Sequence, residues 1–136
     1  MVKLLHTAPI FIYGPMAGYA LLAILAGFYG RRRRSLPRWF WTLSLLLLVV
    51  LLFDGAAAGL LYLSGARPRR ALHLLYGVLA LGGGLIQYGL RPGGFLRRTS
   101  SGALTRDQVL TIALIALTEA ALIMRAWMTG ADVGLR

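Results

Sequence analysis

Residues 45–52 read LLLLVVLL, an uninterrupted apolar run inside a longer stretch from Trp39 to Ser64. That longer stretch contains a single charged residue, Asp54. A helix needs about 20 residues to cross the hydrocarbon core of a bilayer, which is about 30 Å thick. An α-helix also satisfies all of its own backbone hydrogen bonds in lipid. The stretch therefore predicts a membrane-spanning helix.

Three further stretches have the same character. The chain of 136 residues is 58% hydrophobic and 14% charged, whereas an average soluble domain has about 25% charged residues. We therefore predict one membrane domain covering residues 1–136, folded as an all-α four-helix transmembrane bundle with up-down-up-down topology. The predicted spans are residues 9–29, 39–64, 71–90 and 108–128.

Arginine and lysine gather between these spans and give a net charge of +11. Basic loops set membrane topology and contact anionic lipid head groups, so the charge does not indicate a nucleic-acid partner. Nine basic residues fall on one side of the membrane: Arg31, Arg32, Arg33, Arg34, Arg38, Arg91, Arg97, Arg98 and Arg106. Five fall on the other side: Lys3, Arg67, Arg69, Arg70 and Arg136.

The positive-inside rule assigns the side with nine basic residues to the cytoplasm. It therefore predicts that loops 31–38 and 91–107 are cytoplasmic and that both termini lie outside. We expect the membrane to be the inner membrane of a bacterium or an archaeon.

The chain has two histidines, and the predicted topology places both at the same edge of the membrane. His6 precedes the first span, and His73 is the third residue of the third span. Imidazole is an axial ligand of haem iron, and a pair on two parallel helices can hold one porphyrin between them. The sequence thus favours a haem site with His6 and His73 as its metal ligands. The alternative for His6 is an interfacial position without a ligand.

Helical spacing places His73, Tyr76 and Gly77 on one stripe of the third span, followed by Ala80 and Gly84. Gly77 lies one turn from His73 and leaves room for a flat ring beside the backbone. Close helix packing explains the small residues equally well, but it does not explain His73.

Ionisable residues within spans are energetically expensive and usually mark function. Asp54 lies in the second span, Glu119 in the fourth, and Arg125 further along the fourth span. We expect Asp54 and Glu119 to form a buried polar cluster that tunes a redox potential or proton uptake. Arg125 is either an ion-pair partner of Asp54 or extends to the head groups, and Glu119 is alternatively an interhelical hydrogen-bonding group.

Signatures of common enzymes are absent from the sequence. It contains no GxSxG, HExxH, Walker or dinucleotide-binding motif. The lack of cysteine excludes disulfides, thiolate chemistry and iron–sulfur ligation, and a zinc site would need three or four ligands at matched spacing. We assign no catalytic residue and expect a subunit instead of a stand-alone enzyme.

The layout resembles small four-helix membrane proteins that bind b-type haem, namely the cytochrome b561-like group and half-sized relatives of haem A synthase. The resemblance rests on His6, on the segment LHLLYG at residues 72–77, and on Arg125. It implies one haem b with His6 and His73 as axial ligands and Arg125 near a propionate. A cytochrome b561 typically has two haems and four histidine ligands, whereas this chain offers one pair.

Three functions are consistent with these features. The favoured one is an electron-transfer subunit that binds haem b, or a quinone, near the outer face and contacts lipid and other membrane subunits. The second is a cofactor-free accessory subunit of a respiratory or photosynthetic complex. The third is a small proton-coupled transporter that uses Glu119 or Asp54.

Overall fold

Four long helices and one short 3₁₀ helix form the regular structure of this chain. The computed structural model describes residues 9–65, 71–97 and 103–130. The elements are α2 (Pro9–Arg31), α3 (Arg38–Leu63), α4 (Ala71–Gly89), η1 (Phe95–Arg97) and α5 (Arg106–Gly130). All four long helices are long and apolar enough to cross a membrane. The predicted all-α fold is confirmed, and each predicted span corresponds to one of these helices.

The helix ends follow local sequence signals. The backbone N–H of Thr105 donates to Oε1 of Gln108 over 3.0 Å, and the N–H of Gln108 donates to Oγ1 of Thr105 over 3.3 Å. This reciprocal capping box starts α5 before the predicted Gln108. At the end of α3, Gly65 adopts a φ of 96°, a left-handed conformation that glycine reaches at little cost.

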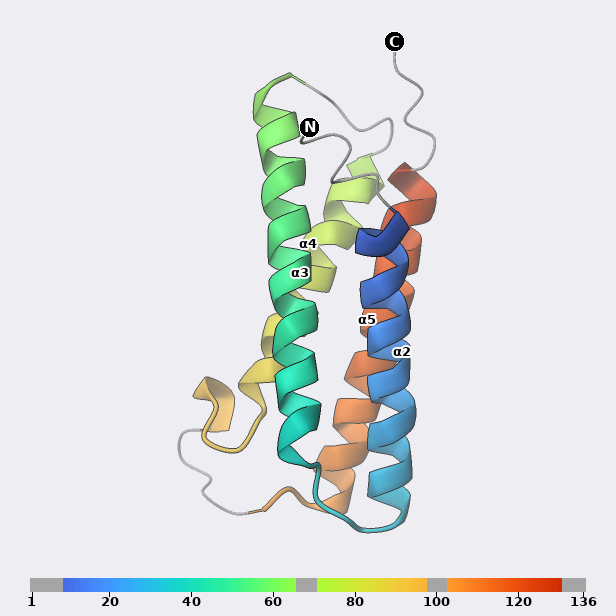
Figure 1. Ribbon diagram of the computed structural model, residues 1–136, viewed down its shortest axis with the longest axis vertical. Helices are drawn as coiled ribbons and strands as arrows, with labels where there is room; N and C mark the ends of the chain where they lie inside the picture. The colour runs from blue at the N-terminus through green and yellow to red at the C-terminus, as the bar shows by residue number, and fades with distance from the viewer. Residues whose placement is uncertain (1–8, 66–70, 98–102, 131–136) are drawn as a thin grey trace.

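The helices lie side by side along the long axis of the molecule (Figure 1). The loop from α2 to α3, the 3₁₀ helix η1 and the start of α5 lie at one end, called here the Arg97 end. The first turns of α2 and α4 and the last turns of α3 and α5 lie at the other end, called here the His73 end.

Helix α2 packs most extensively on α5, and α4 packs on both α5 and α3. Helix α3 is attached mainly through α4 and less through α2. The core lies between these helices and includes several side chains that are fully buried: Tyr19, Leu22, Ala26, Phe40 and Ala116.

Burial is uneven along the bundle. The buried residues of α3 run from Phe40 to Leu51, with none in the rest of that helix, and those of α4 begin at Ala80. The second half of α3 and the first half of α4 meet at the His73 end, so this end is packed less tightly than the Arg97 end. The unequal packing leaves space for a pocket.

Large apolar side chains cover the outside of the bundle. Leu63 is 83% exposed, Ile24 is 70% exposed and Val78 is 66% exposed. A helix of a water-soluble bundle carries a polar outer face, whereas helices that are apolar all round belong in a core or a membrane. The exposed surface therefore fits contact with membrane lipid, as does the length of the four helices.

Candidate functional site

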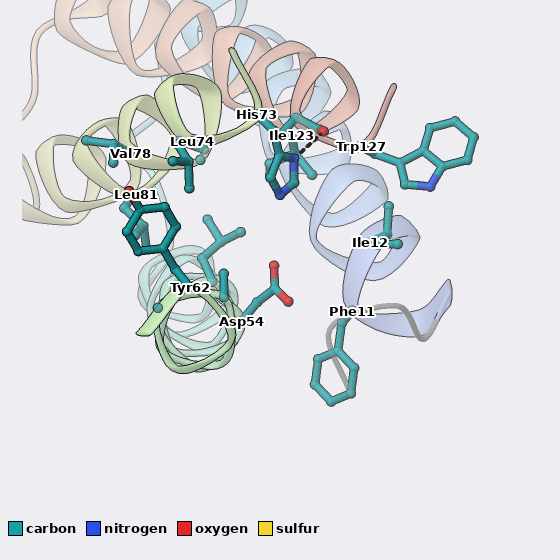
Figure 2. A pocket seen from close by; sticks show the side chains of 17 residues that line it. Phe11, Ile12, Asp54, Tyr62, His73, Leu74, Val78, Leu81, Ile123 and Trp127 are labelled. Carbon is teal, nitrogen blue, oxygen red and sulfur yellow. Dashed lines mark hydrogen bonds between the residues drawn. The ribbon is translucent and has the colours of Figure 1, made fainter. Parts of the chain in front are cut away.

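The loose packing at the His73 end leaves a partly open pocket of about 620 Å³, called here the end pocket (Figure 2). All four long helices contribute to its walls, which are mostly apolar. The lining residues are Phe11, Ile12, Leu51, Asp54, Gly55, Ala58, Gly59, Tyr62, His73, Leu74, Gly77, Val78, Ala80, Leu81, Ile123, Ala126 and Trp127.

His73 enters the pocket from the first turn of α4 and is half-buried. Its Nδ1 lies 2.8 Å from the backbone carbonyl oxygen of Ala126 on α5. A carbonyl oxygen can only accept, so Nδ1 carries the hydrogen and donates it. In the neutral imidazole the lone pair is then on Nε2, which can bind a metal or accept a hydrogen bond. Metal-ligating histidines are oriented by this type of bond to a backbone carbonyl.

Helix α3 supplies the other polar groups of the pocket. Asp54, Ala58 and Tyr62 are spaced four residues apart and therefore share one face of the helix. Figure 2 shows the Asp54 carboxylate directed toward the imidazole of His73 on α4. The site thus brings an imidazole and a carboxylate to one apolar cavity.

The glycines of the pocket have two different explanations. A Cβ placed on Gly55 would lie 2.9 Å from Cδ1 of Leu81, so this glycine allows α3 and α4 to approach closely. A Cβ on Gly59 or on Gly77 would have nothing within 4 Å. Close packing therefore does not explain Gly77, and the space beside it is part of the pocket.

The other predicted site residues lie apart from these groups. Tyr76 is half-buried and Arg125 is exposed, and neither lines the end pocket. Glu119 is buried deeper in the bundle. His6 lies outside the described residues. The structure therefore brings His73, Gly77 and Asp54 together and leaves Tyr76, Arg125 and Glu119 outside the pocket.

Trp127 and the first turn of α2 complete the wall, which the sequence did not indicate. Trp127 lies in the last turns of α5 and lines the pocket. Its ring is tilted against that of Tyr13, with the ring centroids 5.5 Å apart. The sequence shows that Tyr13 lies near the start of the first span and Trp127 near the end of the fourth. It does not show that their rings are in contact, because that depends on how α2 and α5 pack.

Metal binding by protein groups alone is not supported within residues 9–65, 71–97 and 103–130. This part of the chain holds no group of three or more His, Cys, Asp or Glu side chains that could bind an ion. A haem needs fewer protein ligands, because the porphyrin supplies four of its own.

Known proteins provide no match from which a role for the site could be inferred. No protein-family model, no curated protein and no solved structure matches this chain.

Proposed function

We propose that this protein is a redox subunit of the inner membrane of a bacterium or an archaeon, and that the end pocket binds one haem b for electron transfer. The observation that carries the proposal is His73, held in an apolar pocket with its Nδ1–H donated to the carbonyl of Ala126. The imidazole is thereby oriented as a haem ligand requires.

Three features of the pocket fit a porphyrin. Its volume of about 620 Å³ lies within the usual range of ligand sites, about 300–1,000 Å³. The open space beside Gly77, one turn from His73, gives a flat ring access to the α4 backbone. Phe11 of α2 also lines the pocket, and His6 lies only five residues before it in the sequence. His6 would therefore be the second residue to hold the haem.

A bound haem b supplies one-electron transfer through its iron. In this proposal His73 holds the ring, the carbonyl of Ala126 orients the imidazole, and the apolar walls exclude water. Arg125, which is exposed near the end of α5, is the group available for a propionate.

The proposed orientation follows from the basic residues. The Arg97 end carries the four consecutive arginines of residues 31–34, so the positive-inside rule places it in the cytoplasm. The four helices then cross in up-down-up-down order, and the end pocket faces the outer side. This orientation puts the haem near the outer surface, where a partner subunit can reach it.

Absorption spectra test the haem site. We expect the protein purified in mild detergent to show a Soret band and, after dithionite reduction, sharp α and β bands. His73→Ala should abolish these bands, and His6→Ala should alter or abolish them. Met124→Ala, at an exposed position of α5 outside the pocket, is the matched control and should leave the spectrum unchanged.

A protein that lacks haem after expression with ample haem supply would overturn this assignment. A quinone is the second candidate, because the Asp54 carboxylate faces His73 across an apolar cavity (Figure 2). Both groups can accept hydrogen bonds from the hydroxyls of a quinol. Solvent extraction of the colourless protein should then yield quinone, and Asp54→Asn should lower the amount. A protein without haem and without quinone would be an accessory subunit.

A further inference from the structure

Glu119 is the sole glutamate of the chain, and its side chain lies in the middle of the bundle. It is 1% exposed, and its Oε2 atom has no hydrogen-bond partner among the described residues. Its carboxyl group occupies the space that a side chain on Gly83 of α4 would fill. The glycine thus forms a notch in α4 that receives the carboxyl group from α5.

Two more polar groups point into the same region from other helices. The hydroxyl of Tyr19 on α2 lies against Gly84, 2.9 Å from where its Cβ would be. Gln87 follows Gly83 by one turn on the same face of α4. Tyr19 and Gln87 are fully buried, and the Tyr19 hydroxyl and Gln87 Oε1 have no partner within the described part of the chain. Three helices therefore place buried, unpartnered oxygen atoms beside or within the one turn of α4 that runs from Gly83 to Gln87.

An ionised carboxylate in this region would be unstable. Moving an ion out of water costs several kcal/mol unless an opposite charge compensates. The neighbouring phenol of Tyr19 supplies no positive charge to the carboxyl group. A bound proton is the simplest way to neutralise the carboxyl group.

Further polar groups lie between this region and the Arg97 end. Gln87 donates from Nε2 to Oγ of Ser44 on α3 over 3.4 Å. A second cavity of about 280 Å³ is lined by Leu90, which directly follows α4, and by Arg97 and Gln108, among others. In the other direction, the buried apolar side chains of Leu51 and Ile123 line the end pocket.

We propose that Glu119 holds a proton inside the bundle and exchanges it with water at the Arg97 end, through Gln87, Ser44 and the second cavity. Each exchange breaks the O–H bond of the carboxylic acid and forms a new one to a proton from water, and no electron moves. Bridging waters between polar groups of this kind are a common feature of protein interiors. The proposal requires no cofactor in the end pocket, so its test does not depend on the proposed haem or quinone.

Isotope-edited infrared spectroscopy tests the proposal in the protein without any substitution. Cell-free synthesis with glutamate carrying ¹³C in its side-chain carboxyl group labels Glu119 alone, because the chain has no other glutamate. In lipid nanodiscs at neutral pH we expect the labelled carbonyl stretch of a protonated acid. Transfer to D₂O should shift this band downward as the deuteron replaces the proton.

Two variants test the route. Gln87→Leu should keep the labelled acid band and slow its shift in D₂O by roughly tenfold or more, because a buried hydrogen-bonding group of the route is lost. Ser44→Ala removes only a hydroxyl and should also slow the shift in D₂O. It is the second test of the route in case Gln87→Leu disturbs folding. Thr118→Val is the matched control: Thr118 neighbours Glu119 but is exposed, so the rate should be unchanged.

Three results would overturn the proposal. The first is a labelled group that gives only the stretches of an ionised carboxylate. The second is an acid band that does not shift in D₂O, which would make Glu119 a sealed structural group. The third is an unchanged exchange rate in both Gln87→Leu and Ser44→Ala.

Discussion

Gly82 and Gly83 are neighbours on α4, yet added methyl groups would meet different surroundings. A Cβ on Gly82 would have nothing within 4 Å, whereas a Cβ on Gly83 would collide with the carboxyl group of Glu119. Because Glu119 is itself buried, its carboxyl group has little room to move aside. The two positions therefore form a matched pair that isolates the contact between α4 and Glu119.

We predict that Gly83→Ala lowers the free energy of unfolding by about 1–3 kcal/mol, the usual cost of overpacking a core. Gly82→Ala should be neutral or stabilising, because alanine is favoured over glycine within a helix by about 0.5–1 kcal/mol. The free energies of unfolding of the two variants can be measured in detergent or in lipid bicelles. The penalty of Gly83→Ala should largely disappear in a Glu119→Ala background. Equal stabilities of the two single variants would show that Glu119 does not occupy the notch.

At the scale of helices, uninterrupted apolar stretches between basic loops predict the four spans, and their observed ends differ by at most two residues. Helical spacing also predicts that Gly77 shares a face with His73. The contact of Glu119 with Gly83 was not predictable in this way, because it depends on how each helix is rotated in the bundle. The residues of α3 itself are apolar on every face of the helix, so its sequence does not indicate which face is buried.

The first half of α4 provides a second matched pair. Gly77→Leu should place an apolar side chain in the end pocket, where a Cβ has open space, and should prevent haem binding without loss of fold. Gly82→Leu also adds a side chain into open space, but Gly82 does not line the pocket. Haem content per protein, measured with helicity by circular dichroism, compares the two. Full haem content in Gly77→Leu would place the haem elsewhere.

At the scale of the whole molecule, charge and packing divide the bundle into two unlike ends. The Arg97 end contains the buried first half of α3, while the His73 end contains the pocket. The larger number of basic residues at the Arg97 end predicts, by the positive-inside rule, that this end faces the cytoplasm. With this orientation, the proton route through Gln87 opens to the cytoplasm and the pocket lies near the outer face. A redox group and a proton site would then be reached from opposite sides of the membrane.

Cysteine labelling tests this orientation directly, because the chain has no native cysteine. Ser35 lies in the loop between α2 and α3, Ser64 follows α3, and both are exposed. A membrane-impermeant maleimide should label Ser64→Cys in intact spheroplasts and Ser35→Cys only after permeabilisation. The unmodified protein is the control and should take up no label. The reverse pattern would place the end pocket on the cytoplasmic side, and the proton route through Gln87 would then open to the outside.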